Sequence, residues 1–407
     1  MRTTLDYAEA PYTPRGYYAM LGICLVVLVG GLIAAHQMAE VGHRVTGMTD
    51  RVVWGLPHVV ALFLILSGAG SLCVASLAVA WRRVIYARLA RLSCVVAMAL
   101  LAGGLSILVL DLGRPGNLMT ALGALNFSSI FSLNLFVYAS FFLVVGALLW
   151  TLLEYRMNRW ARAVGVVAFL WQILLATDIG SVFGVLAART AYDGAIMAPL
   201  AVAMSLALGL GVFILVLVAA LAWAGRPCGE LVVARLGRLL GMFVLVALYL
   251  VAVQHVVHSY GAARAGFVNF ILADGGVYTA LFWLGQVIAG SLVPLAMLFQ
   301  PALARRRGAL AVAAGLVVIG GISWLYVTVI GGQAYPMTLF AGRSVSSSAL
   351  DGEVAAYAAR WTEVLLGAGG LALAMLLTAI AVKVLAVLPV TLADAEVDPH
   401  HRPATGS

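Results

Sequence analysis

Charged side chains are scarce in this sequence, and their scarcity excludes an ordinary water-soluble protein. Asp, Glu, Lys and Arg make up 10% of the 407 residues, whereas a soluble globular protein carries about 25%. Hydrophobic residues make up 64% of the chain, so most of the surface must face something other than water. We therefore expect one helical membrane bundle with short connections rather than several soluble domains.

Cysteine and lysine are also rare. The four cysteines, Cys24, Cys73, Cys94 and Cys228, show no CxxC or other metal-ligand spacing, so we expect no iron–sulfur cluster or structural zinc held by this chain. The net charge of +8 comes from arginines in short connections, with Lys383 as the single lysine. This pattern is typical of membrane topology and argues against a nucleic-acid partner.

Long segments without formal charge define the fold class. A bilayer core needs about 20 apolar residues per helix, and such segments lie near 16–38, 54–81, 92–110, 128–153, 163–187, 195–224, 239–258, 276–300, 308–330 and 362–389. Strands of a membrane barrel would be about ten residues long with strict alternation. The sequence therefore predicts an all-α integral membrane protein with about ten transmembrane helices.

The arginines predict the orientation of these helices. Most of them lie before the first helix, in the even-numbered connections and in the C-terminal tail. Because the arginine-rich side is cytoplasmic, both termini should be cytoplasmic. We expect a cytoplasmic N-terminal segment at 1–15, a membrane domain at 16–390 and a cytoplasmic tail at 391–407. Residues 1–15 lack the features of a signal peptide, so the first helix should be retained.

Titratable residues gather toward the opposite, outer face. His36, Glu40 and His43 share one stripe of a helix, where they could bind a quinone carbonyl and accept its proton. A metal site is a weaker alternative, and a solvated interfacial helix explains the same spacing. His58 begins the second helix. It could complete a site with His36 or bond a backbone carbonyl.

Two aspartates need partners. Asp111 and Arg114, at the end of the third helix, are spaced to form an ion pair, so they could clamp a turn as well as contact a ligand. Asp178 is the only acidic residue well inside a span. A charge there costs about 2.5–3.5 kcal/mol, so Asp178 should face the bundle interior, as a proton relay or as a protonated, hydrogen-bonded acid.

Two histidines mark the outer end of the seventh helix. His255 and His258 share a helix face. Haem ligation is an alternative because helical bundles hold haem, but no repeated histidine spacing of a membrane cytochrome b accompanies them. Tyr335 follows two glycines after the ninth helix, where an aromatic-belt residue would lie at the interface.

Several motifs together resemble one family. VTGM at 45–48, VWGLPH at 53–58, LDLGRP at 110–115 and NFSSIF at 126–131 resemble the NrfD/PsrC family of membrane quinone-interacting subunits. DGGVY at 274–278, GGQAYP at 331–336 and SSS at 346–348 resemble the DsrP-type subunit of the transmembrane complex linked to dissimilatory sulfite reductase. The similarity covers nearly the whole chain except about 15 residues at each end.

The resemblance implies a fold and a set of partners. The fold is two four-helix bundles, here helices 2–5 and 6–9, with two flanking helices. The chain would bind menaquinone or ubiquinone as substrate near the periplasmic face and carry no haem or iron–sulfur cluster. Its partners would be a periplasmic ferredoxin-like iron–sulfur subunit, a multihaem cytochrome, other subunits and membrane lipid. The setting would be dissimilatory sulfur metabolism, with the chain in a bacterial inner membrane.

The sequence thus predicts a quinone-interacting subunit of an oxidoreductase complex that is not active alone. We assign proton transfer to Glu40 and Asp178. We assign quinone binding to His36, His43, His58, Asp111, Arg114, His255, His258 and Tyr335. The alternative is a secondary transporter or a proton-conducting subunit. A transporter would carry inverted repeats with helices broken at the midplane, whereas these titratable residues cluster toward one face.

Overall fold

The computed structural model describes residues 7–8, 14–112, 116, 118, 120, 123, 126, 128–187, 189–192, 194–336 and 352–397. Within them, 10 helices are long and apolar enough to cross a membrane. They are α1 (Pro14–Val41), α2 with α3 (Leu56–Ser71 and Cys73–Val79), α5 (Ala90–Leu110), α7 (Ile130–Leu153), α8 (Ala161–Gly184), α9 (Met197–Trp223), α10 (Glu230–Ser259), α12 with η4 and α13 (Val277–Ala280, Leu281–Leu292 and Val293–Phe299), α14 with η5 and α15 (Arg307–Tyr326, Val327–Gly331 and Gly332–Ala334) and α16 (Trp361–Val384). The prediction of an all-α membrane protein with about ten spans is confirmed.

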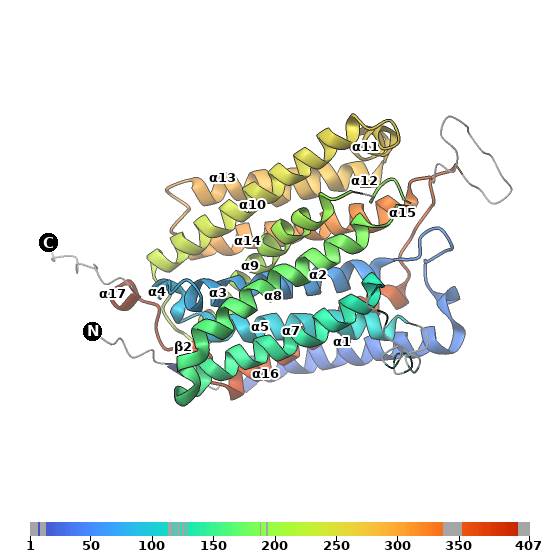
Figure 1. The fold of residues 1–407 in the computed structure, drawn as a ribbon. Helices are drawn as coiled ribbons and strands as arrows, with labels where there is room; N and C mark the ends of the chain where they lie inside the picture. Colours follow the sequence, from blue (N-terminus) through green and yellow to red (C-terminus); the bar gives the residue numbers. More distant parts are fainter. Residues whose placement is uncertain are drawn as a thin grey trace.

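The remaining elements are short and lie at the ends of the long helices. They are β1 (Tyr7–Ala8), η1 (His43–Val45), α4 (Val84–Ala87), η2 (Tyr155–Trp160), α11 (Ala265–Asn269), η3 (Phe270–Asp274), β2 (Leu388–Pro389) and α17 (Asp394–Val397). The long helices run side by side along one axis, with α4, β2 and α17 at one end and α11, α12 and α15 at the other (Figure 1). We call the first of these the inner end and the second the outer end.

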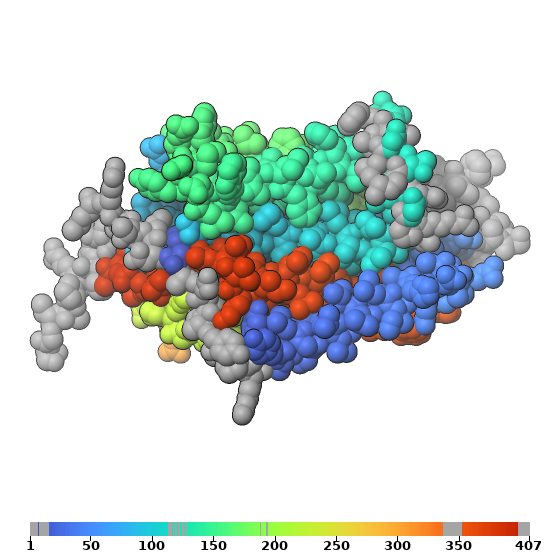
Figure 2. Space-filling view, turned by 90° about the horizontal axis from the view of Figure 1, so that it is seen from below, coloured from blue at the N-terminus to red at the C-terminus, as the bar shows by residue number. Residues whose placement is uncertain are grey.

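The helices pack as two groups of four. The first group holds α2 with α3, α5, α7 and α8, and the second holds α9, α10, α12 to α13 and α14. Contacts of α2 and α8 with α9 join the two groups. Helix α1 packs along α16, and α16 packs on α5, so the first and last spans lie side by side against the first group (Figure 2). The two four-helix bundles with two flanking helices are therefore observed.

Two helix boundaries differ from the predicted spans. Helix α10 begins at Glu230 rather than near 239, because charged residues past the membrane edge do not end a helix. The Asp394 carboxylate accepts hydrogen bonds from the Glu230 and Leu231 N–H groups at 3.1 and 3.0 Å and so caps this extension. Helix α16 ends at Val384 rather than near 389. Pro389 favours extended backbone at Leu388, which pairs antiparallel with Ala8.

Segments from both ends of the chain contact the inner ends of the helices. The Tyr7 hydroxyl donates to the Ala87 carbonyl at 2.9 Å, and the Arg91 guanidinium lies 3.9 Å from the centre of the Tyr7 ring. Arg88 pairs with Glu396 at 3.0 Å. These parts of 1–15 and 391–407 are thus attached to the bundle. The division of the chain into an N-terminal segment, a membrane domain and a tail remains a prediction.

Glycine makes the closest approach between the two groups possible. A Cβ added to Gly70 on α2 would lie 1.6 Å from the Ser205 carbonyl oxygen on α9. A Cβ added to Gly209 on α9 would lie 2.2 Å from the Ser71 nitrogen. The two backbones therefore touch at this point, as small residues allow between membrane helices.

Candidate functional site

A cavity of about 420 Å³ lies toward the outer end of the first helix group, among α2, α5, α7 and α8. This volume is within the range of small-molecule sites, about 300–1,000 Å³. Its walls are mostly aliphatic and aromatic, including Trp54 and Phe183. The polar side chains on its wall include those of His58, Asn134 and Tyr138. The cavity thus combines apolar walls with a few polar groups.

Half-buried His58 and buried Asp111 form a pair at this cavity. His58 lies in the first turn of α2, and Asp111 directly follows α5. Their Nδ1 and Oδ2 atoms are 3.1 Å apart but not aligned as a hydrogen bond. Neither that nitrogen nor either carboxylate oxygen has a hydrogen-bond partner among the described residues. Because buried polar atoms are nearly always paired, these atoms without partners make the pair a candidate site for a ligand or a proton.

The Asp111 carboxyl group titrates near neutral pH. Its side chain is 1% exposed. Burial, and after it the charge of Glu363, raises the pKa of Asp111 from its usual value near 3.8 to about 7. Strongly shifted groups of this kind are common where protons are exchanged. The pair can therefore accept or donate a proton beside the cavity.

A second carboxylate contacts a residue of the cavity wall but does not itself line the cavity. Asp178 on α8 is buried at 4% exposure, as its position inside a span predicts. When the Asn134 amide is oriented with its nitrogen toward α8, it donates to both Asp178 oxygens. Asn134 and Tyr138 lie one turn apart on α7, and both line the cavity. Asp178 thus holds a polar group of the cavity wall in place.

A buried glutamate fastens the loop between α1 and α2. Glu363, in the first turn of α16, is 0% exposed. Its carboxylate accepts hydrogen bonds from the Gly47 N–H at 2.7 Å, the Arg360 N–H at 2.9 Å and the Tyr357 hydroxyl at 2.6 Å. The Tyr357 oxygen accepts in turn from the Leu56 N–H at 2.7 Å. Glu363 therefore connects the last span to the residues that lead into His58.

Gln333 fastens the same loop from the second helix group. Its side-chain oxygen accepts from the Val53 and Trp54 N–H groups at 2.9 and 3.0 Å, and its side-chain nitrogen donates to the Trp54 carbonyl at 2.9 Å. Arg189 donates to the backbone carbonyls of Gln333 and Arg51 at 2.7 and 2.8 Å. The residues that carry the VWGLPH and GGQAYP motifs thus meet beside the cavity.

Comparison with known proteins places the chain in a family. Residues 44–337 match the family described as polysulphide reductase, NrfD. This chain belongs to that family. An Hdr-like menaquinol oxidoreductase integral membrane subunit of Archaeoglobus fulgidus is 25% identical over 376 residues, which cover 92% of this chain and 94% of that protein.

Two further relatives of this NrfD-family chain are named as subunits of reductases. A putative membrane subunit of dimethyl sulfoxide reductase from Halobacterium salinarum is 26% identical, over 75% of this chain and 74% of that protein. A selenate reductase subunit of Mesobacillus selenatarsenatis is 21% identical, over 76% of this chain and 81% of that protein. The matched family segment contains His58, Asp111 and Asp178, whereas His36, Glu40 and His43 precede it.

The other predicted site residues that the structure describes do not line this cavity. His36 and Glu40 are exposed on α1, and His43 is exposed in η1. Arg114 lies outside the described residues. No set of three or more His, Cys, Asp or Glu side chains in the described part of the chain is arranged to hold a metal ion. The roles assigned to these four residues remain predictions.

The histidines of α10 belong to the second helix group. The His255 Nδ1 lies 2.8 Å from the Val251 carbonyl oxygen, one turn earlier in the same helix. His258 is 2% exposed, near the backbone of Gly194. Tyr335 packs against the ring of Phe267, with 5.5 Å between ring centres. These predicted quinone ligands lie at the same outer end as His58 but in different surroundings.

Replacing Glu363 with Leu should lower the stability of this outer end by about 3 kcal/mol or more. The change leaves the Gly47 N–H, the Arg360 N–H and the Tyr357 hydroxyl without their acceptor, and each hydrogen bond to a charged group contributes about 1.5–3 kcal/mol. Thermal unfolding in detergent measures the loss. Glu363→Gln is the matched control, because its amide oxygen still accepts from both N–H groups. Equal melting temperatures for the two variants would contradict this role.

Proposed function

We propose that this chain is the membrane subunit of a respiratory oxidoreductase complex and that it binds quinol or quinone in the cavity at His58 and Asp111. The observation that carries the proposal is His58, which lines a mostly apolar cavity and lies 3.1 Å from the buried Asp111 carboxylate, whose oxygens have no hydrogen-bond partner among the described residues. A quinone ring has two oxygens that need hydrogen bonds and an apolar body that needs apolar walls. The names of the relatives, a menaquinol oxidoreductase subunit among them, support the same reading.

The pair is suited to take a proton from a quinol. Oxidation of a quinol to a quinone releases two electrons and two protons. The His58 Nδ1 faces Asp111, so Nε2 is the ring nitrogen left for a quinol hydroxyl. As Nε2 accepts the proton, the Asp111 carboxylate stabilises the positive imidazolium ring. Asp178, behind Asn134, is the second carboxylate close to the cavity and stays our candidate for the second proton.

The position of the cavity toward the outer end suits electron transfer to a partner subunit. We propose that the electrons pass to a periplasmic ferredoxin-like iron–sulfur subunit on the outer loops, with a multihaem cytochrome and other subunits in the complex. The arginine-rich inner end favours cytoplasmic termini in a bacterial inner membrane. Menaquinone or ubiquinone is the proposed substrate, and dissimilatory sulfur metabolism the proposed setting.

Quinol oxidation by the reconstituted complex tests the cavity. We expect His58→Ala to lower the rate of oxidation of a soluble naphthoquinol about a hundredfold, because the proposed proton acceptor is lost, and to raise the KM about tenfold, because one hydrogen bond to the substrate is lost. His36→Ala is the comparison, since His36 lies on the exposed stripe of α1. A loss confined to His36→Ala would move the site to α1 and overturn the cavity assignment.

A further inference from the structure

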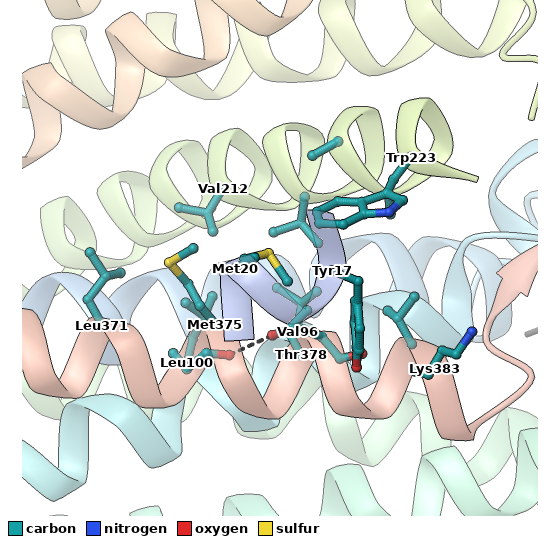
Figure 3. A pocket seen from close by; sticks show the side chains of 16 residues that line it. Tyr17, Met20, Val96, Leu100, Val212, Trp223, Leu371, Met375, Thr378 and Lys383 are labelled. Atoms are coloured by element: carbon teal, nitrogen blue, oxygen red, sulfur yellow. Dashed lines mark hydrogen bonds between the residues drawn. The ribbon is translucent and has the colours of Figure 1, made fainter. Parts of the chain in front are cut away.

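A second cavity, of about 250 Å³, lies toward the inner end of the bundle. It is bounded by α1, α5, α9 and α16, and it is partly open. Tyr17 and Met20 reach it from α1, Trp223 from α9, and Met375 and Lys383 from α16 (Figure 3). It shares no lining residue with the cavity at His58.

The two hydroxyl groups on its wall already have hydrogen-bond partners. The Thr378 hydroxyl donates to the Ala374 carbonyl of its own helix at 2.8 Å (Figure 3). The Tyr17 hydroxyl donates to the Ala379 carbonyl at 3.4 Å. The wall therefore presents hydrocarbon and the thioethers of Met20 and Met375, which adapt to a flexible apolar chain. A quinone ring would find few hydrogen-bond partners here, in contrast to the cavity at His58.

The cavity has the depth of one membrane leaflet. Its lining residues on α16 run from Leu371 to Lys383, about 18 Å along a helix that rises about 1.5 Å per residue. Half of a bilayer core measures about 15 Å. Tyr17 and Trp223, whose ring centres are 6.1 Å apart, lie near the inner ends of their helices, as aromatic belt residues do. The cavity thus extends from the interface toward the midplane.

A basic side chain, that of Lys383, lies at the interfacial end of the cavity. Lys383 is in the last turn of α16, at the end of the bundle where the arginines of the α9–α10 and α13–α14 connections also lie. Basic residues at this level attract anionic lipid headgroups. The lysine stem can lie along the apolar wall while its ammonium group reaches the headgroup region.

We propose that this cavity binds one acyl chain of an anionic phospholipid, whose phosphate group lies beside the Lys383 ammonium. The lipid comes from the leaflet at the arginine-rich inner end. It fills the space between α1 and α9 and thereby fastens the flanking pair of helices, α1 and α16, to the rest of the bundle. This inference is independent of the proposed quinone site.

Native mass spectrometry of the purified chain tests the proposal. The protein is titrated in detergent with phosphatidylglycerol or with phosphatidylcholine of the same acyl chains. We expect one phosphatidylglycerol to be retained in preference to phosphatidylcholine. Lys383→Met should weaken phosphatidylglycerol binding about fivefold, to the level of phosphatidylcholine, because one cation at the surface is lost. Arg305→Met, which removes an exposed cation from the same end, should leave the preference unchanged.

A variant that fills the cavity tests the contribution of the acyl chain to binding separately from that of the headgroup. Met375→Trp, at a half-exposed position of the wall, should abolish retention of both lipids while quinol oxidation by the complex is unchanged. Val216→Phe fills the same cavity from α9 and serves if the first variant does not fold. Equal affinity of the two lipids, or retention by the filled variants, would overturn the proposal. So would loss of bound quinone, rather than phospholipid, on filling.

Discussion

Replacing Asp111 with Asn should lower the rate of quinol oxidation by the reconstituted complex about a hundredfold or more. A positioned acid–base group contributes about 10²–10⁴-fold to such a step. The amide keeps the size of the carboxyl group but cannot carry the negative charge that stabilises a protonated His58. The measurement is steady-state oxidation of a naphthoquinol between pH 5.5 and 8.5.

The pH profile gives a sharper test than the rate alone. Below its pKa of about 7, Asp111 is protonated and neutral, and above it the carboxylate is available. Quinol oxidation by the unmodified chain should therefore rise as the pH increases through 7 and then level off. In the reverse direction, quinone reduction should fall over the same range, because the proton held by the His58–Asp111 pair is then the one that is donated. Asp111→Asn should remove this change in both directions.

The control for this prediction is an aspartate in the same outer region. Asp50 is exposed in the loop between α1 and α2, so Asp50→Asn should keep both the rate and the pH profile. An Asp111→Asn variant that retained more than a third of the rate and the rise through pH 7 would remove Asp111 from the proton path. The profile of the His58→Ala variant would then show whether another group titrates.

Replacing Gly70 with Ala should prevent the two helix groups from packing. A Cβ there would lie 1.6 Å from the Ser205 carbonyl oxygen and 2.3 Å from its carbonyl carbon, and a backbone cannot give way as a flexible side chain can. Helices α2 and α9 would have to separate, which opens cavities along their whole contact. We expect a loss of more than about 4 kcal/mol. It would be seen as aggregation on size-exclusion chromatography or as a large fall in melting temperature on thermal unfolding.

A second glycine provides the matched control. Gly146 on α7 has nothing within 4 Å of an added Cβ. Gly146→Ala should leave the melting temperature unchanged or raise it, because Ala favours a helix over Gly by about 1 kcal/mol. If Gly70→Ala and Gly146→Ala behaved alike, the close approach of α2 and α9 would not be needed for the fold.

The number and class of the helices could be predicted because a membrane leaves the chain few choices. A backbone in lipid must satisfy its own hydrogen bonds, so charge-free segments of sufficient length become helices. The same argument predicts that Asp178 faces the interior, where it is found. Helix ends were less predictable. The charged residues around Arg235 lie within α10 and do not end it. The helix begins where Asp394, far away in the sequence, accepts a hydrogen bond from its first N–H group.

The candidate site was harder to predict, because hydropathy gives the depth of a residue and not its neighbours. His58, His255 and His36 are all near outer helix ends, yet only His58 among them lines the cavity. Its partner is Asp111 because α2 and α5 pack side by side. Asn134 and Tyr138 were missed, although two polar residues one turn apart in an apolar helix are a usable signal. The role of Glu363 could not be predicted either, because it depends on hydrogen bonds to residues that lie up to 316 positions away in the sequence.

The hydrogen bond between Glu363 and Gly47 joins residues 316 positions apart in the sequence. Proteins are synthesised from the N-terminus at about 5–20 residues per second, so the loop before His58 emerges about 15–60 s before the glutamate that fastens it. The outer end of the first helix group therefore acquires its final form last. A chain that is released before α16 has been made cannot complete this fastening, so incompletely synthesised copies lack the fully formed site.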